Sequence, residues 1–191
     1  MPTNSLHPRE LGARLETRAR AFAAALPPET RIASVTVAAP AFAADLLPPD
    51  GADAAYWAQP QRDVLLLGLG RAWSWSTGGA HRFAELGGQM RSLRAAWAHR
   101  DADATGERPR AFAGFAYDPD DAADAPPNLE LRVPELLLAR AASGVHATLS
   151  WQPDGTGAAL ARALERASAW LDALPDGTGG DPASLARIAA M

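Results

Sequence analysis

The sequence predicts an α+β fold in which mostly antiparallel strands are flanked by three helices. Three segments with helical apolar spacing stand far apart in the chain, and short strand-like stretches fill the intervals between them. Grouped strands between separated helices favour an α+β fold over a repeated β-α-β pattern. Many connections between the strand-like stretches are short, which is typical of antiparallel pairing.

Apolar spacing defines the three helices. The first is predicted from Pro8 to about Leu26, with Leu11, Leu15, Phe22 and Leu26 on one face. Pro27-Pro28 ends it, because proline is tolerated in the first turn of a helix but not in its interior. In the other two helices, apolar residues spaced three and four apart form one stripe. These stripes are Phe83, Leu86, Met90, Leu93 and Trp97 in the second helix and Leu160, Leu164, Ala167, Leu171 and Leu174 in the third. The adjacent Gly87 and Gly88 indicate either close packing of the second helix or a break in it.

The strand-like stretches are short and rich in β-branched, aromatic or alternating residues. VLLLGLG after Asp63 has the continuous apolar character of a buried strand. Between positions 109 and 140 we predict two long strands joined by an acidic, proline-rich turn, the second of them ending in VPELLLAR. The other predicted strands cover 32–37, 56–57, 72–77 and 145–151.

Composition excludes several classes of function. The net charge of −4 and the pI near 5.5 argue against a nucleic-acid partner, which would require a basic surface. The absence of cysteine excludes disulfides, thiolate metal sites and a cysteine nucleophile, and all 18 basic residues are arginine, which excludes a lysine base. The polar N-terminus is unlike a signal peptide, and no apolar run reaches the length of about 20 residues that spans a membrane. We therefore expect a cytoplasmic protein that binds neither nucleic acid nor membrane.

The domain organisation is predicted to be simple. Residues 1–174 form one α+β region, and residues 175–191 form a linker rich in glycine and proline that leads into the start of a further element.

Candidate chemical motifs are few. Gly68-Leu69-Gly70 follows a strand, but Trp73 occupies the place of the third glycine of a dinucleotide fingerprint, so a tight turn or a close backbone approach is favoured. The four histidines lack metal-ligand spacing and are interpreted as surface or hydrogen-bonded core residues. They are His7, His81, His99 and His146.

Two polar clusters and the tryptophans also have structural interpretations. The acidic cluster lacks the glycine and the terminal glutamate of a calcium loop, so we interpret it as a solvated turn; it comprises Asp118, Asp120, Asp121 and Asp124. Ser74, Ser76 and Thr77 lie near His81 without the strained turn of a nucleophile, which favours a polar strand face. Most of the tryptophans fall on predicted apolar faces, so core packing is favoured over a stacking surface. The six are Trp57, Trp73, Trp75, Trp97, Trp151 and Trp170.

The order of motifs between Tyr56 and Trp151 resembles the N-terminal half of isochorismate synthases, members of the chorismate-utilising enzyme family. The similar segments are YWAQPQRDVLLLGLGRAW, Arg82-Phe83, RPRAFAGFAYDP and LELRVPELLLAR. The matching positions are Phe112, Gly114, Phe115, Tyr117, Pro134, Glu135 and Arg140. The chain departs from the family pattern at Ala113, where glycine is usual, at Tyr117, where phenylalanine is usual, and in lacking a tryptophan before the last strand.

The resemblance implies an α+β fold and the Mg²⁺-dependent isomerisation of chorismate to isochorismate, for menaquinone or siderophore synthesis. In the family a lysine-activated water attacks the ring, a glutamic acid protonates the departing hydroxyl and glutamates hold the metal, all in a C-terminal half. No catalytic, cofactor-binding or metal-binding residue is therefore carried over to this chain. We expect an N-terminal scaffold that is inactive without the catalytic half as its partner, with chorismate and Mg²⁺ bound in the full-length enzyme.

Two alternatives remain open. The chain is, in the first, part of component I of an anthranilate or aminodeoxychorismate synthase, although no LLES-like tryptophan-binding signature is evident. In the second it is a freestanding binding or interaction module built on the same half-fold.

Overall fold

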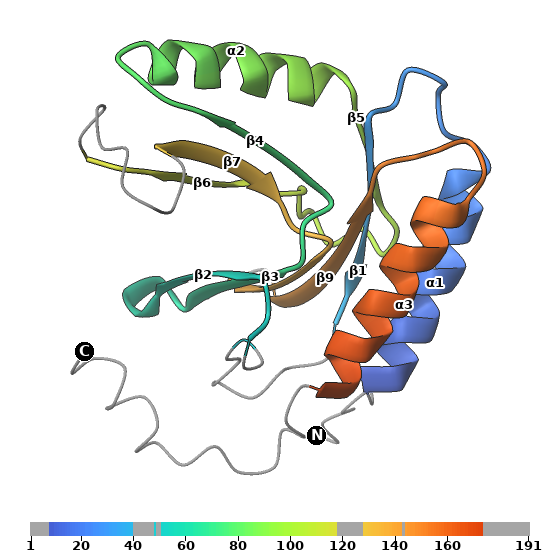
Figure 1. The fold of residues 1–191 in the computed structure, drawn as a ribbon. Helices are drawn as coiled ribbons and strands as arrows, with labels where there is room; N and C mark the ends of the chain where they lie inside the picture. The colour runs from blue at the N-terminus through green and yellow to red at the C-terminus, as the bar shows by residue number, and fades with distance from the viewer. Residues whose placement is uncertain (1–7, 40–47, 49–50, 118–127, 143, 174–191) are drawn as a thin grey trace.

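The computed structural model describes residues 8–39, 48, 51–117, 128–142 and 144–173 (Figure 1). Within these residues the chain forms three α-helices, one short 3₁₀ helix and nine strands. In chain order they are α1 (Pro8–Ala23), β1 (Ile32–Ala38), β2 (Ala54–Gln59), η1 (Pro60–Arg62), β3 (Val64–Leu69), β4 (Trp73–Thr77), α2 (Arg82–Ala95), β5 (Trp97–Asp101), β6 (Phe112–Phe115), β7 (Leu129–Val133), β8 (Leu136–Ala141), β9 (Gly144–Trp151) and α3 (Ala158–Ala173). The predicted α+β class is confirmed.

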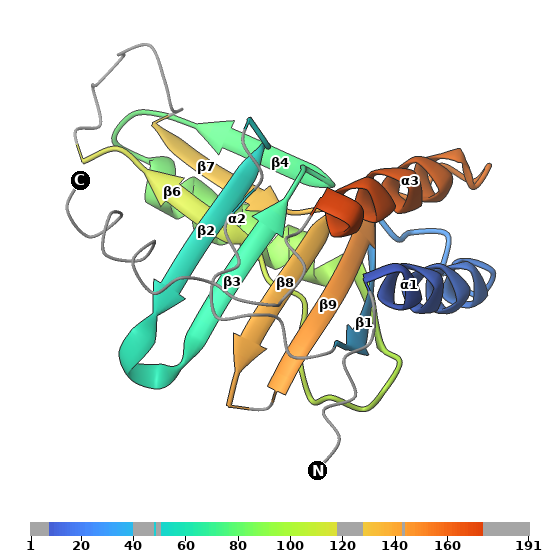
Figure 2. The same ribbon diagram turned by 90° about the horizontal axis from the view of Figure 1, so that it is seen from below.

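The strands form two sheets. One has six strands in the order β2-β3-β8-β9-β1-β5, and the other has three in the order β4-β7-β6 (Figure 2). Every pairing is antiparallel except that of β1 with β5, which is parallel. The prediction of mostly antiparallel sheets is therefore confirmed.

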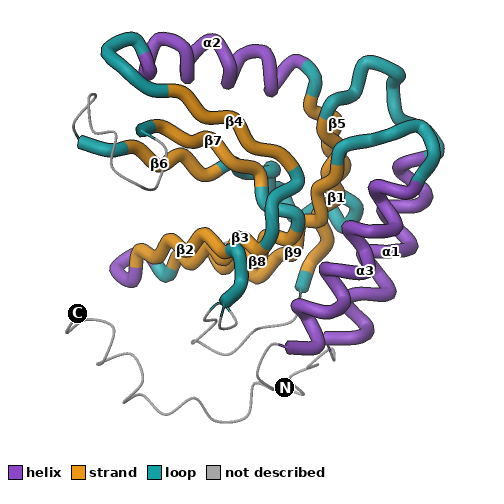
Figure 3. The backbone as a smooth tube through the Cα atoms, viewed as in Figure 1, coloured by secondary structure: helices purple, strands orange, loops and turns teal. Residues whose placement is uncertain are grey.

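Helices α1 and α3 lie side by side against the six-stranded sheet (Figures 1 and 3). The main core forms there because alternate residues of each strand point to this face. It joins Leu11 and Leu15 of α1, Leu171 of α3 and the sheet residues Val35 and Leu149, all fully or almost fully buried. This packing explains the apolar stripes that the sequence shows in the first and third helices.

The three-stranded sheet lies between α2 and the six-stranded sheet (Figure 1). On its α2 side, Trp73, Leu131 and Val133 form a second core with Leu93 of α2. On its other side, Phe112 packs against Leu66, Leu137 and Ala139 of the six-stranded sheet. The two sheets therefore face each other across a small apolar contact.

One prediction that the structure corrects is the single long strand ending in VPELLLAR. Pro134 and Glu135 divide it into β7 and β8, which belong to different sheets. Proline has no N–H to donate to a sheet ladder, and the Glu135 N–H donates instead to the Leu69 carbonyl. The chain thus crosses from one sheet to the other at these two residues.

The second helix also differs from its prediction. It ends at Ala95, and Trp97 begins β5, because the Ala96 carbonyl accepts hydrogen bonds from the N–H groups of Arg31 and Ile32 at the start of β1. The expected stripe is not uniformly buried, since Phe83 is 50% exposed and Met90 is 43% exposed.

The two glycines of α2 are not explained by packing within the described structure. A Cβ at Gly87 or Gly88 would approach only the Arg91 side chain, at 3.7 and 4.0 Å. The helix continues through both residues, so the predicted break is absent and close packing is not found among the described residues. Within the same residues, no helix is long and apolar enough to cross a membrane.

Candidate functional site

Three of the motif residues meet where the two sheets touch. Gly68 of β3 lies against the Phe112 ring of β6 and the Pro134 ring. A Cβ at position 68 would be 2.8 Å from Phe112 Cε2 and 3.0 Å from Pro134 Cβ. Glycine is therefore needed at this position, and the interpretation of the Gly68-Leu69-Gly70 motif as a close backbone approach is confirmed.

Glu135 and Gly70 make further close contacts beside Pro134 and Gly68, on the side of helix α3. The Glu135 carboxylate is buried and accepts two hydrogen bonds from the Arg166 guanidinium of α3, one of them at 2.6 Å from Nε. These bonds raise the pKa of Arg166 even though burial opposes the raise. Gly70 has φ +65°, and a Cβ there would collide with the Trp170 ring. The motif residues thus tie β3, β8 and α3 together rather than forming a reactive site.

Arg132 completes the link between the sheets. Its guanidinium, on β7, forms an ion pair of 2.9 Å with Asp53 and donates hydrogen bonds to the carbonyls of Asp53 and Gly70. The side chain is 10% exposed. A buried arginine with this many acceptors has a structural role, because each bond compensates for the charge being withdrawn from water.

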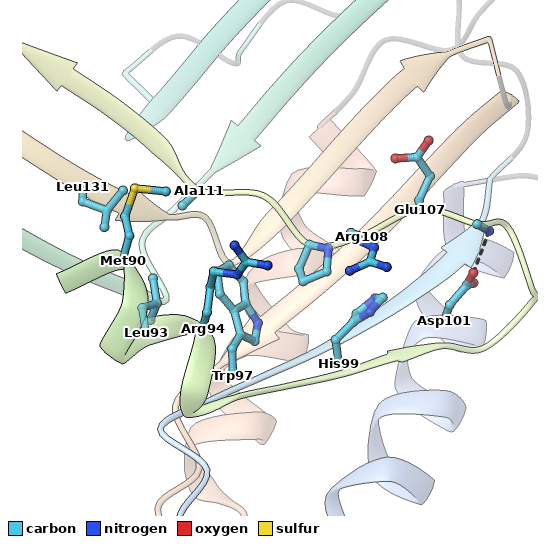
Figure 4. Close-up of a pocket in the computed structure, with 12 residues that line it drawn as sticks. Met90, Leu93, Arg94, Trp97, His99, Asp101, Glu107, Arg108, Ala111 and Leu131 are labelled. Carbon is cyan, nitrogen blue, oxygen red and sulfur yellow. Dashed lines mark hydrogen bonds between the residues drawn. The ribbon is translucent and has the colours of Figure 1, made fainter. Parts of the chain in front are cut away.

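A cavity of about 640 Å³ opens between α2, β5 and the loop that follows β5 (Figure 4). Its volume lies within the range of about 300–1,000 Å³ that is usual for small-molecule sites. Its apolar lining consists of Met90, Leu93, Trp97, Pro109, Ala111 and Leu131. Its polar lining includes Arg94, His99, Asp101, Glu107 and Arg108.

Buried hydroxyl groups hold the strand side of the cavity. The Trp97 indole N–H donates to Ser34 Oγ at 2.8 Å, and His99 Nε2 lies 3.0 Å from Thr36 Oγ1. Ser34 and Thr36 are completely buried and hydrogen-bonded in turn to Ser150 and Thr148 of β9. Side chains supported in this way keep one orientation, which is the condition for a preorganised site.

Two charged side chains, Asp101 and Arg108, act on the pKa of His99 in opposite directions. Burial lowers the pKa of His99, Asp101 opposes this lowering and Arg108 adds to it. Asp101 accepts hydrogen bonds from the Thr105 hydroxyl and the Gly106 N–H. Although burial acts against it, these bonds lower the pKa of Asp101. The Asp101 carboxylate is thus hydrogen-bonded by residues of the turn that follows it.

A family model described as "Chorismate binding enzyme" matches residues 29–179. The chain belongs to this family of chorismate-binding enzymes. The family resemblance carried by FAGFAYDP and VPELLLAR is therefore confirmed. No curated protein sequence matches the chain.

A solved structure shares the fold. It is that of MenF, the menaquinone-specific isochorismate synthase from Escherichia coli, which this chain matches with a TM-score of 0.50 and 17% sequence identity. The match covers 90% of this chain and 35% of MenF. At this identity the likeness establishes the fold alone, and the chorismate-binding family member described here spans about a third of the MenF chain.

Of the remaining candidate residues, the structure describes Ser74, Ser76, Thr77, His81 and His146. Thr77 donates to Glu85 rather than to His81, and Ser74 and Ser76 are exposed on the strand. His146 is buried and lies 3.9 Å from Glu107, whereas His81 precedes α2. His7 and the acidic cluster lie outside the described residues; that cluster is Asp118, Asp120, Asp121 and Asp124.

The tryptophan prediction is confirmed in part. Trp73 and Trp151 are buried in the two main cores, and Trp75, Trp97 and Trp170 pack against them. Trp57, on the edge strand β2, is 46% exposed, so core packing is wrong for this residue.

In the part of the chain that the structure describes, no three His, Asp or Glu side chains come together in a way that could hold a metal ion. The cavity was missed by sequence reasoning because its lining comes from α2, β5, the following loop and β7. The signal that could have indicated it was the pair Trp97 and His99, two residues apart on β5, of which Trp97 was predicted to end the second helix.

Proposed function

We propose that this chain is the N-terminal scaffold region of an isochorismate synthase, acting with a catalytic half on a further polypeptide segment. The observation that carries the proposal is the match of 90% of the chain to only 35% of an isochorismate synthase. The sequence also lacks lysine, the residue that the family resemblance implies as the catalytic base. In this proposal Mg²⁺ and chorismate bind mainly to the catalytic half.

Exposed apolar side chains on three elements support the proposal. Among the described residues, the large exposed ones all come from β2, α2, β6 and the residue that closely follows β6. They are Tyr56, Trp57, Phe83, Met90, Phe115 and Tyr117. Exposed apolar side chains that contact one another, as Phe83 and Phe115 do, are typical of a surface that packs against another protein segment.

Phe83 and Phe115 form the firmest part of this surface. Their rings meet edge to face with centroids 5.3 Å apart, although the side chains are 50% and 61% exposed. The Arg82 guanidinium lies 4.7 Å from the centroid of the Phe83 ring and donates to the carbonyls of Ala116 and Tyr117. The pair is therefore held in place while exposed, as expected of a docking surface.

Strand edges support the same conclusion. Within the described residues, β2 is paired on one side only, with β3, and β6 only with β7. An open edge carries unpaired N–H and C=O groups that can accept another strand. The exposed aromatic residues Tyr56 and Trp57 lie on one of these edges, and Phe115 lies on the other.

The test is the behaviour of the purified 191-residue chain in analytical ultracentrifugation and in binding of a hydrophobic dye. We expect self-association and dye binding, both reduced in the double variant F83S/F115S. The control is R162S, which changes an exposed residue of α3, a helix that packs on the six-stranded sheet rather than on β6 or α2. A clean monomer that binds no dye would contradict the docking surface and would favour the freestanding module.

A further inference from the structure

We propose that the cavity between α2, β5 and the 102–111 loop binds a small aromatic carboxylate. This inference goes beyond the proposed scaffold role and does not depend on it. The cavity joins an apolar wall, two guanidinium groups with no partner among the described residues, and strand side chains held by hydrogen bonds (Figure 4).

The cationic side of the cavity comes from two different elements. Arg94 lies in the last turn of α2, and Arg108 lies in the loop after β5. Within the described structure, neither guanidinium has a hydrogen bond or an ion-pair partner. Most other arginines near the sheets are paired, for example Arg132 with Asp53 and Arg110 with Glu107. Two unpaired guanidinium groups at one cavity favour an anionic ligand, and their planar fork matches a carboxylate.

The acidic residues of the lining do not cancel this preference. Asp101 is engaged by Thr105 and Gly106, and Glu107 accepts a 2.7 Å hydrogen bond from Arg110. Burial lowers the pKa of His99, which leaves its imidazole neutral at pH 7. The charges that remain available to a ligand are those of Arg94 and Arg108.

The apolar wall favours an aromatic ligand over a simple inorganic anion. Met90, Leu93, Leu131 and the Trp97 indole face the same space as Arg94. Trp97 is fixed by its hydrogen bond to Ser34, so its ring offers a stacking surface at little cost in conformational entropy. A ring placed against this wall would bring its carboxylate to the arginines.

The test is a titration of the 191-residue chain with 1-naphthoate, followed by tryptophan fluorescence and by the indole N–H signal of Trp97 in NMR spectra. The W97F variant identifies that signal. We expect saturable binding of 1-naphthoate and at least about 10-fold weaker binding of the neutral 1-naphthalenemethanol, because the alcohol forms no charge-assisted bond. Comparable binding of the two compounds, or no binding of either, would overturn the proposal.

The variants R94A and R108A locate the site. Each is expected to weaken 1-naphthoate binding about 10-fold or more, while circular dichroism confirms that these exposed side chains leave the fold intact. The matched control is R100A, because Arg100 is exposed on β5 but does not line the cavity. An effect of R100A equal to those of R94A and R108A would contradict the assignment. Inorganic phosphate that binds as tightly as 1-naphthoate would show that the apolar wall has no role and would also overturn it.

Discussion

Gly68→Ala probes directly how the two sheets meet. The new Cβ would lie 2.8 Å from Phe112 Cε2 and 3.0 Å from Pro134 Cβ, inside the separation of about 3.5–4.0 Å at which carbon atoms pack. Phe112 is only partly buried and can shift, whereas the Pro134 ring is held between β7 and β8. Overpacking costs about 1–3 kcal/mol, and the lost freedom of the unfolded chain offsets about 0.4–1 kcal/mol. The difference gives an expected net loss of about 1 kcal/mol, and at most about 2.5 kcal/mol, in the free energy of unfolding.

Urea unfolding followed by tryptophan fluorescence measures this loss as a lower midpoint at unchanged slope. The control is Gly114→Ala, since Gly114 lies in β6 with open space around its hypothetical Cβ and no left-handed φ. That variant is expected to match the wild type or to gain up to about 1 kcal/mol. In an F112A background the cost of Gly68→Ala should fall, with a coupling of about 0.5–3 kcal/mol. The reasoning is refuted if Gly68→Ala is as stable as the wild type.

Three further substitutions test other contacts. Glu135→Gln removes the charge that pairs with Arg166. It is expected to lower the free energy of unfolding by about 1 kcal/mol, a value kept small because Arg166 is half exposed, and to reduce the salt dependence of unfolding. Unchanged stability and salt dependence would contradict this. Gly12→Ala places a Cβ 3.8 Å from Leu171 Cδ1, an ordinary contact, and should stabilise α1 by about 0.5–1 kcal/mol in the same urea assay; a loss would show that α1 and α3 pack more tightly than described. Burial lowers the pKa of His99 from 6.5, so the unfolded chain takes up the proton first and stability falls as the pH drops below 6.5. His99→Gln should flatten that slope, and an NMR titration midpoint of His99 above 6.5 would be inconsistent with the account.

The helices α1 and α3 and the buried strand β3 could be predicted because local pattern and tertiary packing agree in them. The stripe that includes Leu11 and Leu15 and the run VLLLGLG both face the same core. The close approach at Gly68 was predictable from residue type alone, since a glycine inside a strand marks a place where other groups come near.

The end of α2 and the break at Pro134 could not be predicted in the same way. The spacing of Trp97 suits a helix, but pairing with β1 places it in a strand, and no local pattern reports on a parallel partner 65 positions earlier along the chain. Pro134 lies within the strand-like stretch LELRVPELLLAR, and the change of sheet becomes visible from the hydrogen bond between Glu135 and Leu69. The cavity depends on the end of α2, because Trp97 and His99 line it from β5.

The central claim is that this chain is a scaffold region and that the chemistry belongs to a catalytic half. The most direct test is incubation of the purified 191-residue chain with chorismate and Mg²⁺, with chromatographic detection of isochorismate. The account predicts no product above the rate without protein, because the sequence contains no lysine to activate water. Formation of isochorismate by the chain alone, in proportion to its concentration, would contradict it.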